Sequence, residues 1–299
     1  MSRHVVAVAR IVETKVGGFA ARTLVSPQGI VEATFVTGAG MVGSSLRHEG
    51  AELLDPRGGV ARYAAAGRAV TLSTASGVLH LDGNGLPIHG LLPGRSRWEV
   101  TGAEATPSAA RLETRMVFSP DAALLEAFPF PHEVRLDVTL RDEALVVATT
   151  LSATGDVAIP VSFGFHPYLR LPGAPREQWI VDLPVRQRLV LDERQLPTGA
   201  REAVRIDPAP LAGRAFDDAF IAPPDGAPFT VAGGGRRIAV EFVRGYAAAQ
   251  VFSPPHAAFI CLEPMTAPAN ALVRGGPDLR LMEPGARFTA EFAIRVARA

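Results

Sequence analysis

Residues 133–152 read EVRLDVTLRDEALVVATTLS, and this stretch decides the fold class. From Val134 to Leu140, apolar side chains alternate with polar ones, which is the period of a β-strand with one buried face. A second apolar run follows the charged residues Arg141–Glu143, which are typical of a hairpin turn. The stretch therefore predicts two antiparallel strands joined by a tight turn.

Short runs of the same kind recur along the chain, separated by 29 glycines and 25 prolines. We therefore expect an all-β fold, a large antiparallel sandwich forming one domain over residues 1–299. Asp121–Ala127 has acceptable helical propensity but is short, and we expect a surface turn there. Further strands are predicted at Val31–Thr37, Val70–Ser73, Arg111–Phe118, Val161–Leu171, Ile238–Val243, Gln250–Phe252, Phe259–Glu263 and Arg287–Val296.

The composition is that of a folded protein without a global charge. Hydrophobic residues make up 47% and charged residues 20%, and 30 basic residues balance 30 acidic ones. The chain can bury a large core, but no net field would draw nucleic acid or an anionic membrane. Met1–Lys15 lacks the apolar core of an export signal, and no run is long enough for a membrane helix. The sole cysteine, Cys261, excludes an internal disulfide and a multi-cysteine metal centre and fits the cytoplasm.

One candidate acid or base is His166, within the predicted strand Val161–Leu171. Strand alternation places Gly164, His166 and Tyr168 on one face and apolar side chains on the other. Because glycine has no side chain, we expect open space beside the imidazole, as on the floor of a cleft. The alternative is a histidine that is merely hydrogen-bonded at a sheet edge.

A second candidate is Glu263, which closes the apolar run Phe259–Leu262 and is therefore drawn toward the interior. Burial raises the pKa of a carboxyl group toward neutrality, as a general base working near pH 7 requires. The alternative is a glutamate at a strand end, paired with one of the many arginines.

Two further segments carry polar groups in constrained surroundings. His89 lies in a loop rich in glycine and proline that can hold it in a fixed geometry, although it could also simply face solvent. Asp217 and Asp218 are adjacent in an extended segment, so only one of them can face a cleft.

At these motifs the sequence resembles the aldose 1-epimerase (galactose mutarotase) family, and in particular its shorter bacterial members. The family has a twisted β-supersandwich fold and needs no cofactor or metal, so the resemblance implies an isomerase acting on a small aldose sugar. The resemblance rests on ordered blocks at Gly40–Arg47, Gly85–Gly90, Phe128–His132, Phe165–Tyr168, Phe216–Phe220 and Phe259–Leu272.

The resemblance also assigns roles. Glu263 would be the general base that takes the proton of the anomeric hydroxyl, and His166 the general acid that protonates the ring oxygen. His89 would polarise the sugar near its ring oxygen, while Asp217 and Gln250 would contact its hydroxyls, with Asp218 as the substitute for Asp217. The expected reaction interconverts the α and β anomers of a hexose such as glucose or galactose.

One segment departs from the family pattern. Members usually carry an Asn-Arg pair before the His-Gly motif, but here the pair is Gly67-Arg68. Arg68 remains a predicted sugar contact, Arg47 is its substitute, and either could instead be a surface arginine, Arg47 pairing with an acid such as Glu49. The departure favours, as a second hypothesis, a non-catalytic carbohydrate-binding protein on the same fold.

Two other functions stay open at this stage. Arg47, Arg95 and Arg97 could bind a phosphate in a sugar-phosphate mutarotase. His89, His166 and Glu263 could be ligands in a metal hydrolase, although none of them shares a close metal-binding spacing. The sequence is compatible with a monomer or a homodimer and does not select the aldose.

Overall fold

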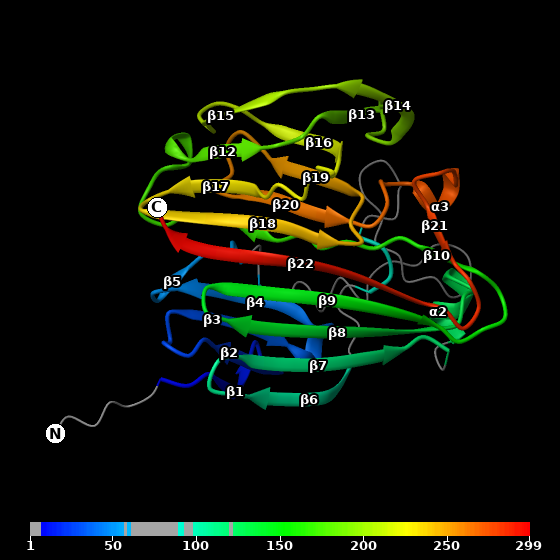
Figure 1. The fold of residues 1–299 in the computed structure, drawn as a ribbon, viewed down its shortest axis with the longest axis horizontal. Coiled ribbons are helices and arrows are strands. Elements are labelled where there is room, and N and C mark those ends of the chain that lie inside the picture. Colours follow the sequence, from blue (N-terminus) through cyan, green and yellow to red (C-terminus); the bar gives the residue numbers. More distant parts are fainter. Residues whose placement is uncertain (1–6, 57–58, 61–88, 93–97, 120–121) are drawn as a thin grey trace. The chain divides into compact units, whose positions relative to one another are not determined.

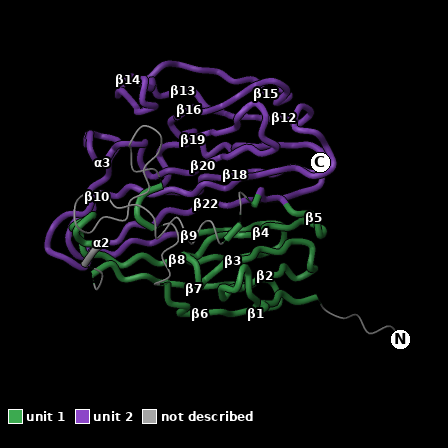
Figure 2. Tube along the Cα trace, turned by 180° about the vertical axis from the view of Figure 1, so that it is seen from behind, with its two compact units in different colours: residues 1–52, 56–147 green, residues 53–55, 148–299 purple. Residues whose placement is uncertain are grey.

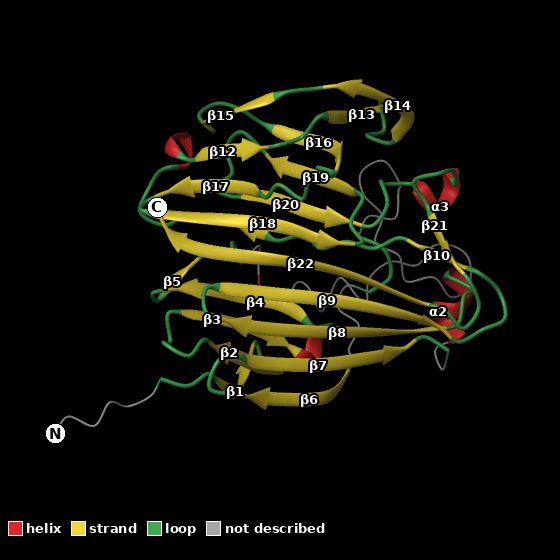
Figure 3. Cartoon of the chain, in the orientation of Figure 1, coloured by secondary structure: helices red, strands yellow, loops and turns green. Residues whose placement is uncertain are grey.

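The computed structural model describes residues 7–56, 59–60, 89–92, 98–119 and 122–299. Strands with antiparallel pairing make up most of this part of the chain, and helices are short (Figures 1 and 3). The prediction of an all-β antiparallel fold is confirmed. The strand predicted at Val70–Ser73 lies outside the described residues.

Contacts divide the chain into two compact units, which Figure 2 colours separately. Unit 1 comprises residues 1–52 and 56–147, and unit 2 comprises residues 53–55 and 148–299. The strand β9 (Ala144–Ala153) continues the chain from unit 1 into unit 2. The expectation of one domain over residues 1–299 stays a prediction.

Unit 1 consists of antiparallel strands that follow one another along the chain. A five-stranded sheet has the order β1-β2-β3-β4-β5, and β6, β7 and β8 pair in sequence with the first part of β9. The elements are β1 (Arg10–Val16), β2 (Phe19–Val25), β3 (Val31–Val36), η1 (Thr37–Ala39), β4 (Val42–His48), β5 (Ala51–Glu52), β6 (Glu99–Ala105), β7 (Ala110–Val117), α2 (Ala122–Ala127) and β8 (His132–Arg141).

The hairpin predicted from residues 133–152 is present as β8 and β9. Along β8, buried residues alternate with more exposed ones, which is the pattern that the apolar periodicity predicted. The turn contains Asp142, whose φ of 49° lies in the left-handed region that aspartate tolerates in tight turns.

The expectation of a mere turn at Asp121–Ala127 is wrong, because the structure has the helix α2 over Ala122–Ala127. Leu124 is 1% exposed, so burial of an apolar side chain stabilises a helix that would be marginal alone.

Unit 2 contains a six-stranded sheet with the order β11-β20-β19-β16-β13-β14, and a second set of strands with the order β15-β12-β17-β18-β22 beside the end of β9. β10 and β21 form a separate pair. The elements are β10 (Ile159–Val161), β11 (Tyr168–Leu169), η2 (Arg176–Gln178), β12 (Ile180–Leu183), β13 (Gln187–Leu191), β14 (Pro197–Ala203), β15 (Ile206–Pro210), β16 (Phe216–Ile221), β17 (Phe229–Gly233), β18 (Arg236–Arg244), β19 (Ala248–Ser253), β20 (Ile260–Met265), α3 (Ala271–Arg274), β21 (Arg280–Met282) and β22 (Arg287–Arg298).

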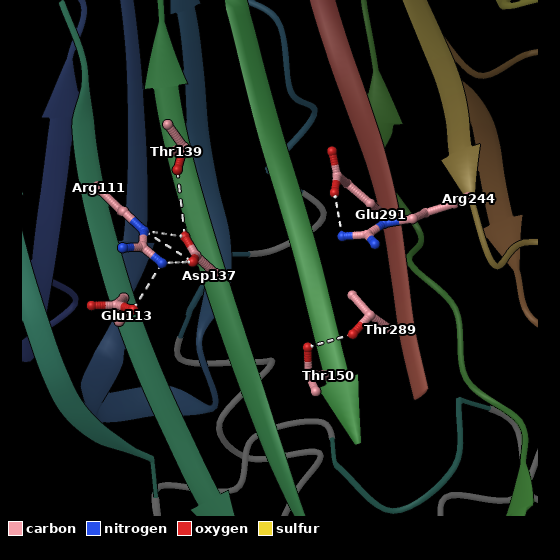
Figure 4. Close-up of polar contacts among 8 residues, drawn as sticks. All are labelled: Arg111, Glu113, Asp137, Thr139, Thr150, Arg244, Thr289 and Glu291. Atoms are coloured by element: carbon pink, nitrogen blue, oxygen red, sulfur yellow. Dashed lines mark hydrogen bonds and ion pairs between the residues drawn. The ribbon is translucent and has the colours of Figure 1, made fainter. Parts of the chain in front are cut away.

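Polar side chains bridge neighbouring strands in both units (Figure 4). In unit 1, Arg111 on β7 binds Asp137 on β8 and also contacts Glu113. In unit 2, the hydroxyls of Thr150 and Thr289 lie 2.9 Å apart. Pairs of this kind contribute about 1 kcal/mol or less each, so they add little to the stability of the fold.

Among the described residues, no helix is long and apolar enough to cross a membrane.

Candidate active site

The six-stranded sheet of unit 2 has two chemically different faces. Residues paired across neighbouring strands point to the same face, and the printed registers pair Gln250 with Glu263, Asp217 with Phe252, and Cys261 with both Phe252 and Tyr168. These six residues therefore share one face, which we call the polar face: Tyr168, Asp217, Gln250, Phe252, Cys261 and Glu263. The opposite face, which we call the apolar face, carries the buried side chains of Leu169, Phe220, Val251, Ile260 and Leu262.

Glu263 is the buried acid of the polar face. The residue is 8% exposed, and burial in β20 raises the pKa of its carboxyl group well above the ordinary value. The negative charge of Asp217 raises this pKa further. The interpretation of Glu263 as an interior carboxylate is supported. Its ion-pair partner among the described residues is His166, whereas the alternative interpretation expected an arginine.

His166 lies in a connection between β10 and β11. The prediction of one continuous strand over Val161–Leu171 is wrong, because β10 ends at Val161 and β11 covers only Tyr168–Leu169. In between, the chain is held against the end of β20: Phe165 N–H donates to the carbonyl of Pro264 at 3.1 Å, and Thr266 N–H donates to the carbonyl of Phe163 at 2.9 Å. These bonds place the next residue, His166, beside β20.

Gly164 is needed for this close approach. A Cβ atom there would lie 2.7 Å from the carbonyl oxygen of Pro264 and 3.2 Å from the side chain of Met265. The expectation that Gly164 leaves open space beside the imidazole is therefore wrong, because the backbone of β20 fills that position. The glycine instead lets the two chain segments touch.

The acid and the base predicted from the sequence lie together. Nε2 of His166 is 3.2 Å from Oε1 of Glu263, although His166 and Glu263 come from different segments of unit 2. The imidazole stacks on the ring of Tyr168, with ring centres 4.4 Å apart and planes 13° apart. Phe252 closes another side, with its ring centre 6.3 Å from that of the imidazole. The imidazole is 26% exposed, so it is the accessible member of the pair.

Asp217 and Gln250 form the next polar pair on the same face. Nε2 of Gln250 donates a hydrogen bond of 2.8 Å to Oδ1 of Asp217. Partial burial raises the pKa of Asp217, the bond from Gln250 lowers it, and the charge of Asp218 raises it. Asp218 itself points to the other side of β16 and forms an ion pair with Arg188 at 3.1 Å. The structure thus separates the two adjacent acids as the alternation predicted, with Asp217 on the side of Glu263.

Sequence reasoning missed one member of the polar face. Cys261 is fully buried, and its sulfur lies within 4.8 Å of ligand atoms of both His166 and Glu263. The signal was available in part, because Cys261 and Glu263 are two residues apart on a predicted strand and must share a face.

The other predicted contacts belong to unit 1 or lie outside the described residues. His89 lies in unit 1, exposed, with a φ of 63° that supports the expected irregular loop geometry. Arg47, also in unit 1, pairs with Glu52 at 3.4 Å instead of with Glu49. Arg68, Arg95 and Arg97 lie outside the described residues.

Solved structures share the fold of the chain. The chain is similar to a galactose mutarotase-like protein from Clostridium acetobutylicum, with a TM-score of 0.81 and 15% identity over 98% of this chain and 99% of that one. It is also similar to a galactose 1-epimerase from Lactobacillus acidophilus NCFM, with a TM-score of 0.73 and 15% identity over 97% of this chain and 99% of that one. At these identities the likeness is one of fold.

The sequence places the chain more narrowly. Residues 57–295 match the profile of the family described as aldose 1-epimerase, and the chain belongs to this family. It is 27% identical over 206 residues to the uncharacterized protein YihR of Escherichia coli (strain K12). That match covers 66% of this chain and 64% of the relative, slightly less than two thirds of its length.

Proposed function

We propose that the protein is an aldose 1-epimerase that interconverts the α and β anomers of a free hexose, such as glucose or galactose, by opening and closing the sugar ring. The observation that carries the proposal is the contact of 3.2 Å between Nε2 of His166 and Oε1 of Glu263. Membership in the aldose 1-epimerase family and the structural likeness to a galactose 1-epimerase support the same reaction.

The reaction needs one base and one acid close together, because the anomeric oxygen and the ring oxygen are bonded to the same carbon. Glu263 takes the proton of the anomeric hydroxyl while His166 donates a proton to the ring oxygen. The bond between C1 and the ring oxygen breaks, and the product is the open-chain aldehyde. Since Glu263 is buried and its pKa is raised, its ionised form is a stronger base than an exposed carboxylate.

Ring closure repeats these steps in reverse on the other face of the aldehyde. Rotation about the bond between C1 and C2 turns the carbonyl over, His166 recovers its proton from the attacking hydroxyl, and Glu263 returns its proton to the carbonyl oxygen. Both groups end as they began, so the cycle consumes no proton.

Sugar binding on the polar face would use Asp217 and Gln250. Asp217 has a second carboxylate oxygen and Gln250 a carbonyl oxygen, and both can accept hydrogen bonds from sugar hydroxyls. The roles that the family resemblance gives His89, Arg68 and its substitute Arg47 stay predictions.

Polarimetry tests the proposal. Freshly dissolved α-D-glucose and α-D-galactose are followed with and without protein, so the uncatalysed reaction provides the baseline. We expect acceleration with at least one of the two. Binding of either sugar without acceleration would contradict catalysis and leave a carbohydrate-binding protein.

A further inference from the structure

The proposed catalytic residues His166 and Glu263 lie close to a third possible metal ligand, Cys261. His166 offers an imidazole nitrogen, Cys261 a sulfur and Glu263 a carboxylate oxygen, and these atoms all lie within 4.8 Å of one another. The proposed epimerase chemistry employs the histidine and the glutamate, and it gives the buried thiol no role.

The set is close to the geometry of a zinc site. Zinc is bound by sulfur at about 2.3 Å and by nitrogen or oxygen at about 2.0–2.2 Å, so tetrahedral ligands lie roughly 3.3–3.8 Å from one another. The donor atoms of His166 and Glu263 lie 3.2 Å apart, about 0.1 Å below the lower end of this range. The sulfur of Cys261 lies within 4.8 Å of both donor atoms, so it must move closer to complete the set.

The buried carboxylate supplies an independent reason for a cation here. Oε1 of Glu263 is inaccessible to solvent and accepts no hydrogen bond of good geometry from the described residues, although Nε2 of His166 lies nearby. A buried carboxylate oxygen in this condition is unfavourable, and a directly bound cation would satisfy it. The imidazole, as the exposed member of the pair, is the first donor that an ion from solvent would meet.

We propose that His166, Cys261 and Glu263 bind one zinc ion, with a water molecule as the fourth ligand, and that this binding inhibits the enzyme. The inhibitory part rests on the proposed epimerase function. The thiol of Cys261 loses its proton to the buffer, the neutral imidazole donates its lone pair, and the ionised carboxylate completes the set. Because the same imidazole and carboxylate cannot then exchange protons with a sugar, zinc and catalysis exclude each other.

Zinc binding is measured directly by titrating the metal-free protein with zinc chloride against a chromogenic chelator. We expect one ion per chain, and at least a tenfold loss of affinity in Cys261→Ser and Cys261→Ala. Two variants are used so that one that fails to fold does not decide the result. His256→Ala, which removes an exposed histidine outside the cluster, should bind zinc like the wild type.

Cobalt(II) chloride gives a spectroscopic readout of the thiolate. We expect a charge-transfer absorption from thiolate to metal in the wild type and none in Cys261→Ser. Unchanged zinc affinity in both cysteine variants, or loss only in His256→Ala, would overturn the site.

Polarimetry with the same proteins separates this proposal from the function on which it rests. Zinc should stop the wild type, and inhibition of Cys261→Ala, expressed relative to the rate of that variant without zinc, should need at least ten times more zinc. Thiolate-dependent zinc binding without any sugar turnover would refute the epimerase and retain the site. Turnover that is insensitive to zinc, without binding, would refute the site and retain the epimerase.

Discussion

The two faces of the six-stranded sheet in unit 2 are formed by the same strands and differ in what they bury. On the apolar face, Val251, Ile260 and Leu262 are fully buried and pack as an ordinary core. On the polar face, the intervening positions of these strands hold Gln250, Cys261 and Glu263. Burying a carboxyl group opposes folding unless partners compensate it, whereas burying leucine favours folding. The apolar face therefore favours folding, whereas the polar face opposes it, as we expect of a face that serves the proposed reaction.

The largest expected effect comes from removing the carboxylate of Glu263 from the polar face. Glu263→Gln keeps the shape of the side chain but cannot accept a proton. General acid–base catalysis typically contributes a factor of about 10²–10⁴, and we expect the acceleration seen by polarimetry to fall by that factor. Thermal unfolding serves as the control for the fold. A variant with near wild-type turnover would remove Glu263 from the role of base.

The adjacent acids of β16 allow a matched comparison of the two faces. Asp217→Asn replaces a charged acceptor beside Gln250, and a hydrogen bond to a charged group contributes roughly 1.5–3 kcal/mol. We expect sugar affinity to fall about ten- to a hundredfold, measured by titration with glucose and galactose. Asp218→Asn only breaks an exposed pair with Arg188 and should leave affinity unchanged. Equal losses in both variants would show that the side of the strand does not matter.

A substitution at Gly164 tests whether the close contact of its segment with β20 positions His166. Gly164→Ala places a methyl group 2.7 Å from the carbonyl oxygen of Pro264, so the segment that carries His166 must move away. Overpacking of this kind costs about 1–3 kcal/mol, and we expect a lower melting temperature together with reduced turnover. Gly213→Ala is the control, because a Cβ atom there meets nothing within 4 Å. The same melting temperature in both variants would contradict the close approach.

The smallest effect is a pH dependence of stability. The pKa of Glu263 is raised in the folded protein above the unfolded value of about 4.3, so between these two pKa values the folded state binds more protons. The free energy of unfolding therefore falls as pH rises through this range. Glu263→Gln lacks this loss and should be more stable than the wild type at pH 8, with a difference that shrinks as pH approaches 4. Asp217 is present in both proteins, so only the part of its titration that depends on the charge of Glu263 differs between them. If the melting temperatures of the wild type and Glu263→Gln differed by the same amount at every pH in this range, the raised pKa of Glu263 would be contradicted.

Local patterns in the sequence predicted the all-β fold class and the longest strands. The hairpin of β8 and β9 and the strands β3, β7, β18, β19, β20 and β22 lie where the apolar runs placed them. The segment around His166 was the exception, because its regular alternation imitates a strand while its actual partner is the end of β20, about a hundred residues further along the chain. Periodicity reports which residues could share a face, but it carries no information on which distant backbone lies beside them.

At the candidate site, too, the sequence indicated candidate residues but not which distant segments lie beside them. His166, Glu263, Asp217 and Gln250 could be selected from the sequence, largely through the family resemblance, and unit 2 holds all four. Gly164 was misinterpreted, because a small residue is compatible both with open space and with a close backbone contact. Cys261 was overlooked: strand alternation places it on the same face as Glu263, but its closeness to His166 follows only from the pairing of β11 with β20.

The central claim is that His166 and Glu263 act as one unit, and a double-variant cycle tests it most directly. Turnover of α-D-galactose and α-D-glucose is compared by polarimetry for the wild type, Glu263→Gln, His166→Asn and the protein with both changes. Groups that act together in one proton-transfer step lose nearly everything when either is removed. We predict that the double variant is about as slow as the slower single variant. Losses that multiply, so that the double variant is slower by the product of the two single factors, would show that the two residues act independently and would contradict the account.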